Sequence, residues 1–125
     1  MIIGIGIDLV EIRRVKQALN KNKSGLKRLF TDAEIKYCRG KRNSSESFAV
    51  RFAAKEAFMK AVGIGWGTKK SPKWNEIEVV TRDNKPSLKF YGKAKVIAGN
   101  LGARNTHISM SHTKEYAMAI VAVEN

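Results

Sequence analysis

This sequence of 125 residues is poor in cysteine and has no long apolar run, and each lack excludes a class of protein. With Cys38 as its one cysteine, the chain cannot form an internal disulfide framework, which indicates a reducing compartment. The longest clean apolar run, residues 116–123, is far shorter than the ~20 residues of a membrane-spanning helix. The opening MIIGIGID has no basic segment and reaches Asp8 too early for a secretion signal. We therefore expect a cytoplasmic protein with no membrane partner.

Acidic residues are also scarce. The chain has 11 Asp and Glu against 24 Lys and Arg, which gives a formal net charge of +13. Eleven basic residues lie between Arg13 and Arg42, where only Asp32 and Glu34 oppose them, so this stretch carries 11 − 2 = +9. Such clustering speeds the encounter with an acidic partner. We interpret it as a binding surface, although an RNA- or ribosome-binding domain without enzymatic activity would also explain the charge.

No linker, repeat or low-complexity tract divides the chain, so we expect one domain over residues 1–125. The opening residues favour a buried strand, in which Gly4 and Gly6 indicate a close backbone approach. Helical patterns cover residues 9–22, 31–38, 46–63 and 93–100, and strand-like patterns cover residues 76–81, 87–91, 106–111 and 116–123. Thr31 and Glu34 fit a capping box at the start of the second helix, and Gly63 is expected to end the third. This order predicts an α+β fold in which an antiparallel sheet packs against the long helix.

Glu56 is the most unusual residue of the long helix. Its neighbours at helical spacing are Ala49, Phe52, Ala53, Met59 and Lys60, and four of the five are apolar. A carboxylate on an apolar face is unfavourable unless it is paired, protonated or bound to a metal. A surface pair with Lys60, worth ~0.2–0.5 kcal/mol, would explain a glutamate at this position only if the other neighbours were polar. We therefore interpret Glu56 as a functional carboxylate.

Asp8 follows an apolar strand and precedes a helical pattern. The residues from Asp8 to Glu11 fit a capping box, and taken alone a helix cap explains Asp8 better than a metal site does. Asp8 and Glu56 are too far apart in sequence to form a local motif. If the fold brings them together, they would form a hard oxygen site suited to Mg²⁺ shared with substrate phosphates.

Other polar and aromatic groups carry weaker signals. His112 lies between Ser111 and Thr113 in an expected turn, where the three could contact a phosphate or an adenine but could equally stabilise the turn. Trp66 and Trp74 lie among lysines and could suit a nucleic acid, although no recognised binding motif accompanies them.

Four segments, taken together and in order, resemble the holo-acyl-carrier-protein synthases, which are small bacterial 4′-phosphopantetheinyl transferases. They are GIGIDLVEIRRV, LFTDAE, RFAAKEAFMKAVGIG and ISMSHTKEYAMAIVAVE, and the resemblance extends from Met1 to Glu124. The segment RDNKP differs, because members of the family commonly have a glycine where this chain has Asn84. Asparagine also adopts a left-handed conformation, so the difference concerns only the turn.

The resemblance implies an activity and an assembly. The family transfers 4′-phosphopantetheine from coenzyme A to a serine of apo acyl carrier protein, releases adenosine 3′,5′-bisphosphate, and so supports fatty acid biosynthesis. Its members are homotrimers of α+β subunits with active sites at the subunit boundaries. The acidic carrier protein and coenzyme A are the implied partners, and no nucleic acid is expected. An inactive relative that only binds the carrier protein is an alternative.

The resemblance also assigns roles to residues. Asp8 and Glu56 match the acids that bind Mg²⁺, Lys60 matches the lysine that contacts phosphate, and these three are the implied catalytic residues. Glu56 or a metal-held water is the implied base. The other matches are to segments near coenzyme A (Arg51, Lys55, Gly63 and Gly65), to a segment that reaches the nucleotide from the neighbouring subunit (Ser111, His112 and Thr113), and to the region that receives the carrier protein (Arg14, Lys21 and Arg28).

Overall fold

The computed structural model describes all residues from 1 to 125. Its elements in chain order are β1 (Ile2–Glu11), α1 (Ile12–Lys21), α2 (Lys23–Leu29), α3 (Asp32–Arg39), α4 (Ser44–Val62), the short 3₁₀ helix η1 (Trp74–Glu76), β2 (Ile77–Arg82), β3 (Lys85–Phe90), α5 (Gly92–Asn100), β4 (Asn105–His112) and β5 (Tyr116–Glu124). The strands form an antiparallel three-stranded sheet, in the order β1-β5-β4, and an antiparallel hairpin of β2 and β3. The predicted α+β class is confirmed.

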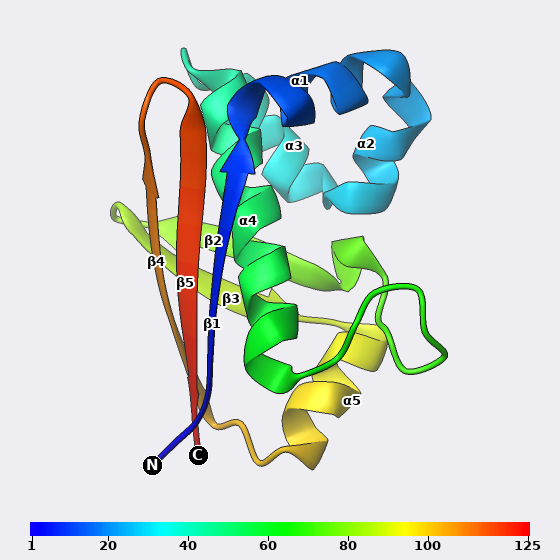
Figure 1. The fold of residues 1–125 in the computed structure, drawn as a ribbon, viewed down its shortest axis with the longest axis vertical. Coiled ribbons are helices and arrows are strands. Elements are labelled where there is room, and N and C mark those ends of the chain that lie inside the picture. Colours follow the sequence, from blue (N-terminus) through cyan, green and yellow to red (C-terminus); the bar gives the residue numbers. More distant parts are fainter.

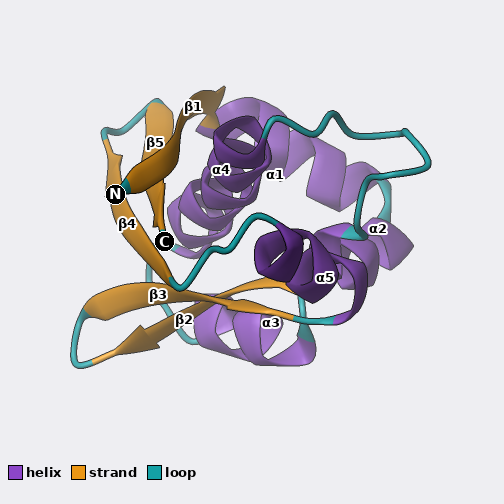
Figure 2. Ribbon diagram, turned by 90° about the horizontal axis from the view of Figure 1, so that it is seen from below, coloured by secondary structure: helices purple, strands orange, loops and turns teal.

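Helix α4 is the centre of the molecule. It lies along one face of the three-stranded sheet, with α1, α2 and α3 at one end and the β2–β3 hairpin and α5 on its other sides (Figures 1 and 2). Its small residues Ala53, Ala54 and Ala57 are fully buried, which lets these elements approach from several directions. The helix begins two residues earlier than predicted and ends as expected at Gly63, which has a left-handed φ of 71°.

The close approach predicted at Gly4 and Gly6 is present. A Cβ on Gly6 would overlap the carbonyl oxygen of Ala57, and one on Gly4 would overlap that of Ala61. Strand β1 therefore packs with its backbone directly on the backbone of α4. This contact determines which side chains of the two elements meet farther along β1.

The junction between β1 and α1 differs from the prediction. Residues 9–11 continue the strand, because β1 pairs with β5 from Gly4 as far as Glu11. The capping interpretation of Asp8 is therefore wrong, since Asp8 lies inside the strand. The first helix also ends at Lys21, and Asn22 then caps α2, which the sequence pattern did not reveal. At that cap, the Asn22 side chain accepts a hydrogen bond from the Gly25 N–H.

Two local motifs expected from the sequence are present. Thr31 and Glu34 form the capping box of α3, in which the backbone N–H of each donates to the side chain of the other. In the β2–β3 turn, Asp83 and Asn84 both have left-handed backbones, with φ of 51° and 62°. Asn84 thus takes the conformation for which glycine is often used, and this turn type suits a tight hairpin.

The outer face of the three-stranded sheet is bare. No helix of the chain covers it (Figure 2). Alternate residues of β1 and β5 expose large apolar side chains there, which we call the outer sheet face: Ile3, Ile5, Ile7, Leu9, Tyr116, Met118 and Ile120. None of the helices is both long and apolar enough to cross a membrane.

Candidate active site

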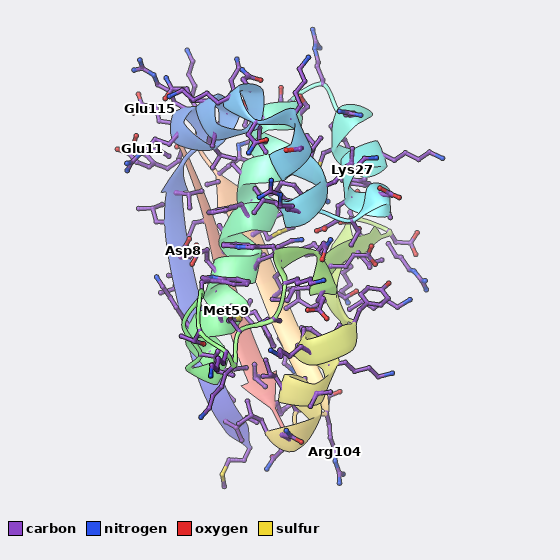
Figure 3. All side chains as sticks on the ribbon, turned by 90° about the vertical axis from the view of Figure 1, so that its right-hand side faces the viewer. Asp8, Glu11, Lys27, Met59, Arg104 and Glu115 are labelled. Atoms are coloured by element: carbon purple, nitrogen blue, oxygen red, sulfur yellow. The ribbon has the colours of Figure 1, made fainter.

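Strand alternation directs Asp8 toward α4. Asp8 is on the same side of β1 as Gly4 and Gly6, which rest on the helix, and its side chain is only 13% exposed. Lys60 of α4 donates a hydrogen bond to Asp8 Oδ1 at 3.0 Å and another to the Ile7 carbonyl oxygen at 3.1 Å. Asp8 lies part-way along β1, beside α4 (Figure 3). The fold thus joins residues 52 positions apart.

Glu56 lies next to Asp8, one helical turn before Lys60. Burial raises the pKa of Glu56 above its usual value, and the negative charge of Asp8 raises it further. The Trp66 side chain and the charge of Lys60 lower the pKa of Glu56, but by less. Two carboxyl groups so placed repel each other when both are ionised, unless positive charge lies between them. We call Asp8 and Glu56 the acidic pair and Lys60 its lysine.

The donor set of this pair fits one kind of metal. The chain has no group of three or more His, Cys, Asp or Glu side chains that could form a closed metal site. Mg²⁺ typically binds one or two carboxylates and completes its coordination with water and substrate phosphates. Two hard oxygen ligands in a half-buried, mutually repulsive pair meet that requirement. They do not fit a structural zinc site, which needs four protein ligands.

A stack of aromatic rings packs on α4 at Phe52, one helical turn before Glu56. The ring centroids of Trp66 and Trp74 are 3.8 Å apart with planes at 8°, and those of Trp74 and Phe52 are 4.8 Å apart with planes at 14°. We call these three residues the aromatic stack. The two tryptophans that could have stacked on nucleic-acid bases are stacked on each other. The sequence pattern did not indicate that Trp66 stacks on Trp74 beside α4.

Arg51 and His112 border a hollow of about 450 Å³, together with residues of the β2–β3 hairpin. The Arg51 side chain is buried and fixed: Nη1 donates to Ser47, Nη2 donates to Thr81, and the guanidinium lies over the Tyr37 ring. Its Nε is buried without a hydrogen-bond partner. A rigid positive group thus borders the hollow.

Lys55 has a structural position. It is fully buried, and its Nζ donates to Glu34 Oε1 at 2.7 Å, to the Leu29 carbonyl oxygen at 2.6 Å and to the Trp74 carbonyl oxygen at 3.1 Å. Burial lowers the pKa of Lys55, and the paired Glu34 opposes that shift. Because an ammonium group has three donors, Lys55 has none left for a ligand. We therefore do not expect Lys55 to contact coenzyme A.

The remaining residues of the expected nucleotide segments are separated. Ser111 pairs with Met118, whose side chain is on the outer sheet face, whereas His112 borders the hollow of Arg51. The Thr113 hydroxyl accepts hydrogen bonds from two backbone N–H groups of the β4–β5 turn. Gly63 ends α4, and Gly65 lies in the exposed loop that follows, where an added Cβ would meet no atom within 4 Å.

The expected carrier-binding residues Arg14, Lys21 and Arg28 are all exposed, on α1 and α2. Arg14 also borders a groove of about 420 Å³, which we call the α1 groove. Its other lining residues are Glu11 and the apolar Leu9, Val10, Val15, Ala18, Leu19, Leu29, Phe52 and Tyr116. The groove is next to the acidic pair, because its lining includes Val10, on the same face of β1 as Asp8, and Phe52, one helical turn before Glu56. Five elements form this groove, so no single sequence segment reveals it.

Comparison with known proteins agrees with this architecture. Residues 4–121 match the family described as the 4′-phosphopantetheinyl transferase superfamily. The fold and site thus define an enzyme of the phosphopantetheinyl transferase class.

Individual relatives identify one family within this class. The holo-[acyl-carrier-protein] synthase of Koribacter versatilis is 45% identical over 127 residues and covers 100% of both chains. The crystal structure of the synthase from Neisseria meningitidis has a TM-score of 0.88 at 29% identity and covers 100% of both chains. That from Bacillus anthracis, in complex with CoA (3′,5′-ADP), has a TM-score of 0.81 at 38% identity and covers 100% of this chain and 98% of that one. The chain belongs to the holo-acyl-carrier-protein synthase family, as the sequence resemblance predicted.

Proposed function

We propose that this protein transfers 4′-phosphopantetheine from coenzyme A to a serine hydroxyl of apo acyl carrier protein and releases adenosine 3′,5′-bisphosphate. Carrier proteins of fatty acid biosynthesis are the proposed acceptors. The observation that carries the proposal is the acidic pair with its lysine beside the α1 groove, in a chain whose relatives bear the name of this activity. Phosphoryl-type transfer depends mostly on positioning and charge neutralisation, and this arrangement can supply both.

Asp8 and Glu56 are the residues that would hold Mg²⁺, which when bound would neutralise and polarise the pyrophosphate of coenzyme A. Lys60 is close to the same phosphates in this proposal, because its ammonium group contacts Asp8 and its side chain is 56% exposed. It can stabilise the charge that develops on the leaving phosphate. The serine must lose a proton, and Glu56, whose pKa is raised by burial, is one proton acceptor. A bound water is the other acceptor.

The hollow of Arg51 is the proposed position of the nucleotide end of coenzyme A. The fixed positive charge of Arg51 and the nearby His112 are suited to a phosphate or an adenine. Arg51 and Glu56 are five residues apart, so they point about 140° apart around α4. This divergence supports a site shared between subunits, in which one chain supplies the acidic pair and its neighbour supplies the hollow.

The outer sheet face supports a homotrimer. Its aliphatic side chains remain widely exposed in one chain, with Ile5 at 59% and Leu9 at 61%. Contiguous apolar surface of this kind marks an interface. A second copy of the same chain would cover it and would bring the acidic pair of one subunit near the hollow of another.

The basic face of α1 and α2 is the proposed docking surface for the carrier protein. Arg14, Lys21 and Arg28 would attract the acidic carrier, and the α1 groove would receive an apolar side chain from it. Because the groove adjoins the acidic pair, docking there would bring the carrier serine close to the pyrophosphate.

The test is to incubate the protein with coenzyme A, Mg²⁺ and apo acyl carrier protein and to measure the mass of the carrier. Addition of one phosphopantetheine supports the proposal. No transfer, together with steeply salt-dependent RNA binding, would instead support a nucleic-acid-binding protein. Carrier binding with neither transfer nor metal-dependent binding of coenzyme A would indicate an inactive relative.

A further inference from the structure

Trp66 carries an unused donor at the site. It lies in the loop after α4, and its indole Nε1 is buried without a hydrogen bond. Buried donors in folded proteins nearly always have an acceptor, so an unused one requires an explanation. Trp66 belongs to the aromatic stack that packs on Phe52, one helical turn before Glu56.

The position of the indole is held from outside the loop. Trp66 stacks on Trp74, and Trp74 stacks on Phe52, which belongs to the same helix as Glu56. The Trp74 carbonyl oxygen also accepts a hydrogen bond from the buried Lys55 Nζ at 3.1 Å. The loop residue Trp66 is therefore anchored to α4 twice through Trp74.

The two acids of the pair have different neighbours. Asp8 is oriented by Lys60, whose Nζ is 3.0 Å from its Oδ1. Glu56 lies one helical turn after Phe52, to which the aromatic stack joins Trp66, and a neutral N–H can orient a carboxylate without neutralising its charge. Donors that orient ligating carboxylates commonly change metal affinity by about 10- to 100-fold.

We propose that Trp66 is a positioning residue for Glu56, whose indole N–H donates to one carboxylate oxygen and leaves the other directed toward Asp8 and a shared divalent cation. This inference rests on the proposed function. The aromatic stack holds the donor in place before the cation arrives, so only the Glu56 side chain has to become ordered when the cation binds.

The matched variants are Trp66→Phe and Trp74→Phe. Each replaces one indole of the stack with a smaller ring, but only the first removes the N–H beside Glu56. The chain has two tryptophans, so a nitrogen-15 NMR spectrum shows two indole signals, and each variant identifies one of them. We expect Mg²⁺ with coenzyme A to move the Trp66 indole proton downfield and to move that of Trp74 much less.

The second measurement is affinity for Mn²⁺, used as the probe and titrated by electron paramagnetic resonance with coenzyme A present. We expect Trp66→Phe to weaken Mn²⁺ binding about tenfold and to raise the Mg²⁺ concentration for half-maximal transfer similarly. The KM for the carrier protein and the Tm should match those of Trp74→Phe. Equal Mn²⁺ affinity in the two variants, or an unmoved Trp66 signal, would overturn the inference.

These outcomes separate two kinds of failure. A wild-type protein that transfers phosphopantetheine while Trp66→Phe keeps wild-type Mn²⁺ affinity contradicts only the role of Trp66. A wild-type protein without transfer contradicts the proposed function, and the inference with it. If Trp66→Phe does not fold, the indole signals of the wild type and of Trp74→Phe still decide the question.

Discussion

At the scale of single residues, Glu56 shows how a functional group can oppose folding. It is half-buried and lies next to a second carboxylate, and both features make its ionised form less favourable in the folded protein than in the unfolded chain. Lys60 reduces this cost only in part. The pair is therefore expected to lower the stability of the protein when no cation is bound.

Replacing Glu56 tests this directly. Because its pKa is raised on folding, ionisation of Glu56 destabilises the protein above the folded pKa, and this penalty disappears as the pH falls below the ordinary glutamate pKa of about 4.3. Glu56→Gln should therefore have a higher Tm than the wild type at neutral pH, with the difference vanishing in acid. The same variant should lose transfer activity by about a hundredfold or more.

Thermal unfolding across pH and the mass assay measure the two effects. The exposed Glu115→Gln serves as the control and should change stability by less than ~0.5 kcal/mol. A Glu56→Gln protein that is no more stable at neutral pH would show that the repulsion is absent. Retained activity would remove Glu56 from the site.

At the scale of elements, the contact between β1 and α4 positions the site. Gly4 and Gly6 allow the two backbones to touch, and this contact places Asp8 opposite Glu56 and Lys60. The glycines thus act on chemistry that takes place farther along the strand. A side chain at either position would displace β1 from the helix.

Gly6→Ala should accordingly be severely destabilising. Its Cβ would overlap the Ala57 carbonyl oxygen, which is helix backbone and cannot move aside as a side chain could. We expect a loss of about 3 kcal/mol or more in the free energy of unfolding, measured by urea denaturation. Gly99→Ala in α5 is the control, because its Cβ would meet no atom within 4 Å. Similar stability for both variants would contradict the close contact.

At the scale of the whole molecule, two surfaces remain unexplained by the isolated chain. One is the apolar outer sheet face, which we propose is covered by other copies of the chain. The other is the basic face of α1 and α2, which we propose receives the carrier protein. Part of the +13 charge of the protein is thus concentrated beside the site that an acidic substrate must reach.

The assembly can be tested by placing a charge on the outer sheet face. Ile7→Lys should convert a trimer into a folded monomer and should lower activity, because a buried, unpaired lysine is unfavourable at an interface. Light scattering coupled to size exclusion measures the mass. Val96→Lys makes the same kind of change at an exposed position on α5 and should leave the mass unaltered. A monomeric wild type would contradict the proposed assembly.

Carrier docking is tested by charge reversal on α1. Arg14→Glu should raise the KM for the carrier protein about tenfold or more, change kcat less, and make the rate less sensitive to salt. Arg104→Glu is the control, because Arg104 lies at the opposite end of the molecule from α1 and α2 (Figure 3). An unchanged KM in Arg14→Glu would place the docking surface elsewhere.

Several features could be predicted from the sequence because they depend on neighbours along the chain. The α3 capping box, the end of α4 at Gly63 and the left-handed Asn84 follow from local residue types. Glu56 was identifiable because its apolar neighbours lie at fixed helical spacing. By contrast, the boundary between β1 and α1 was misplaced, because pairing with β5 extends the strand beyond its local pattern.

The α+β class, the long apolar helix and the excess of positive charge follow from the sequence alone, since periodicity and composition are properties of the chain. The contact of Asp8 with Lys60 beside Glu56, the burial of Lys55 against Glu34 and the stacking of Trp66 on Trp74 exist only in the folded molecule. These contacts join distant segments. Their geometry depends on the register of β1 with β5 and on the backbone approach at two glycines, which no local pattern encodes.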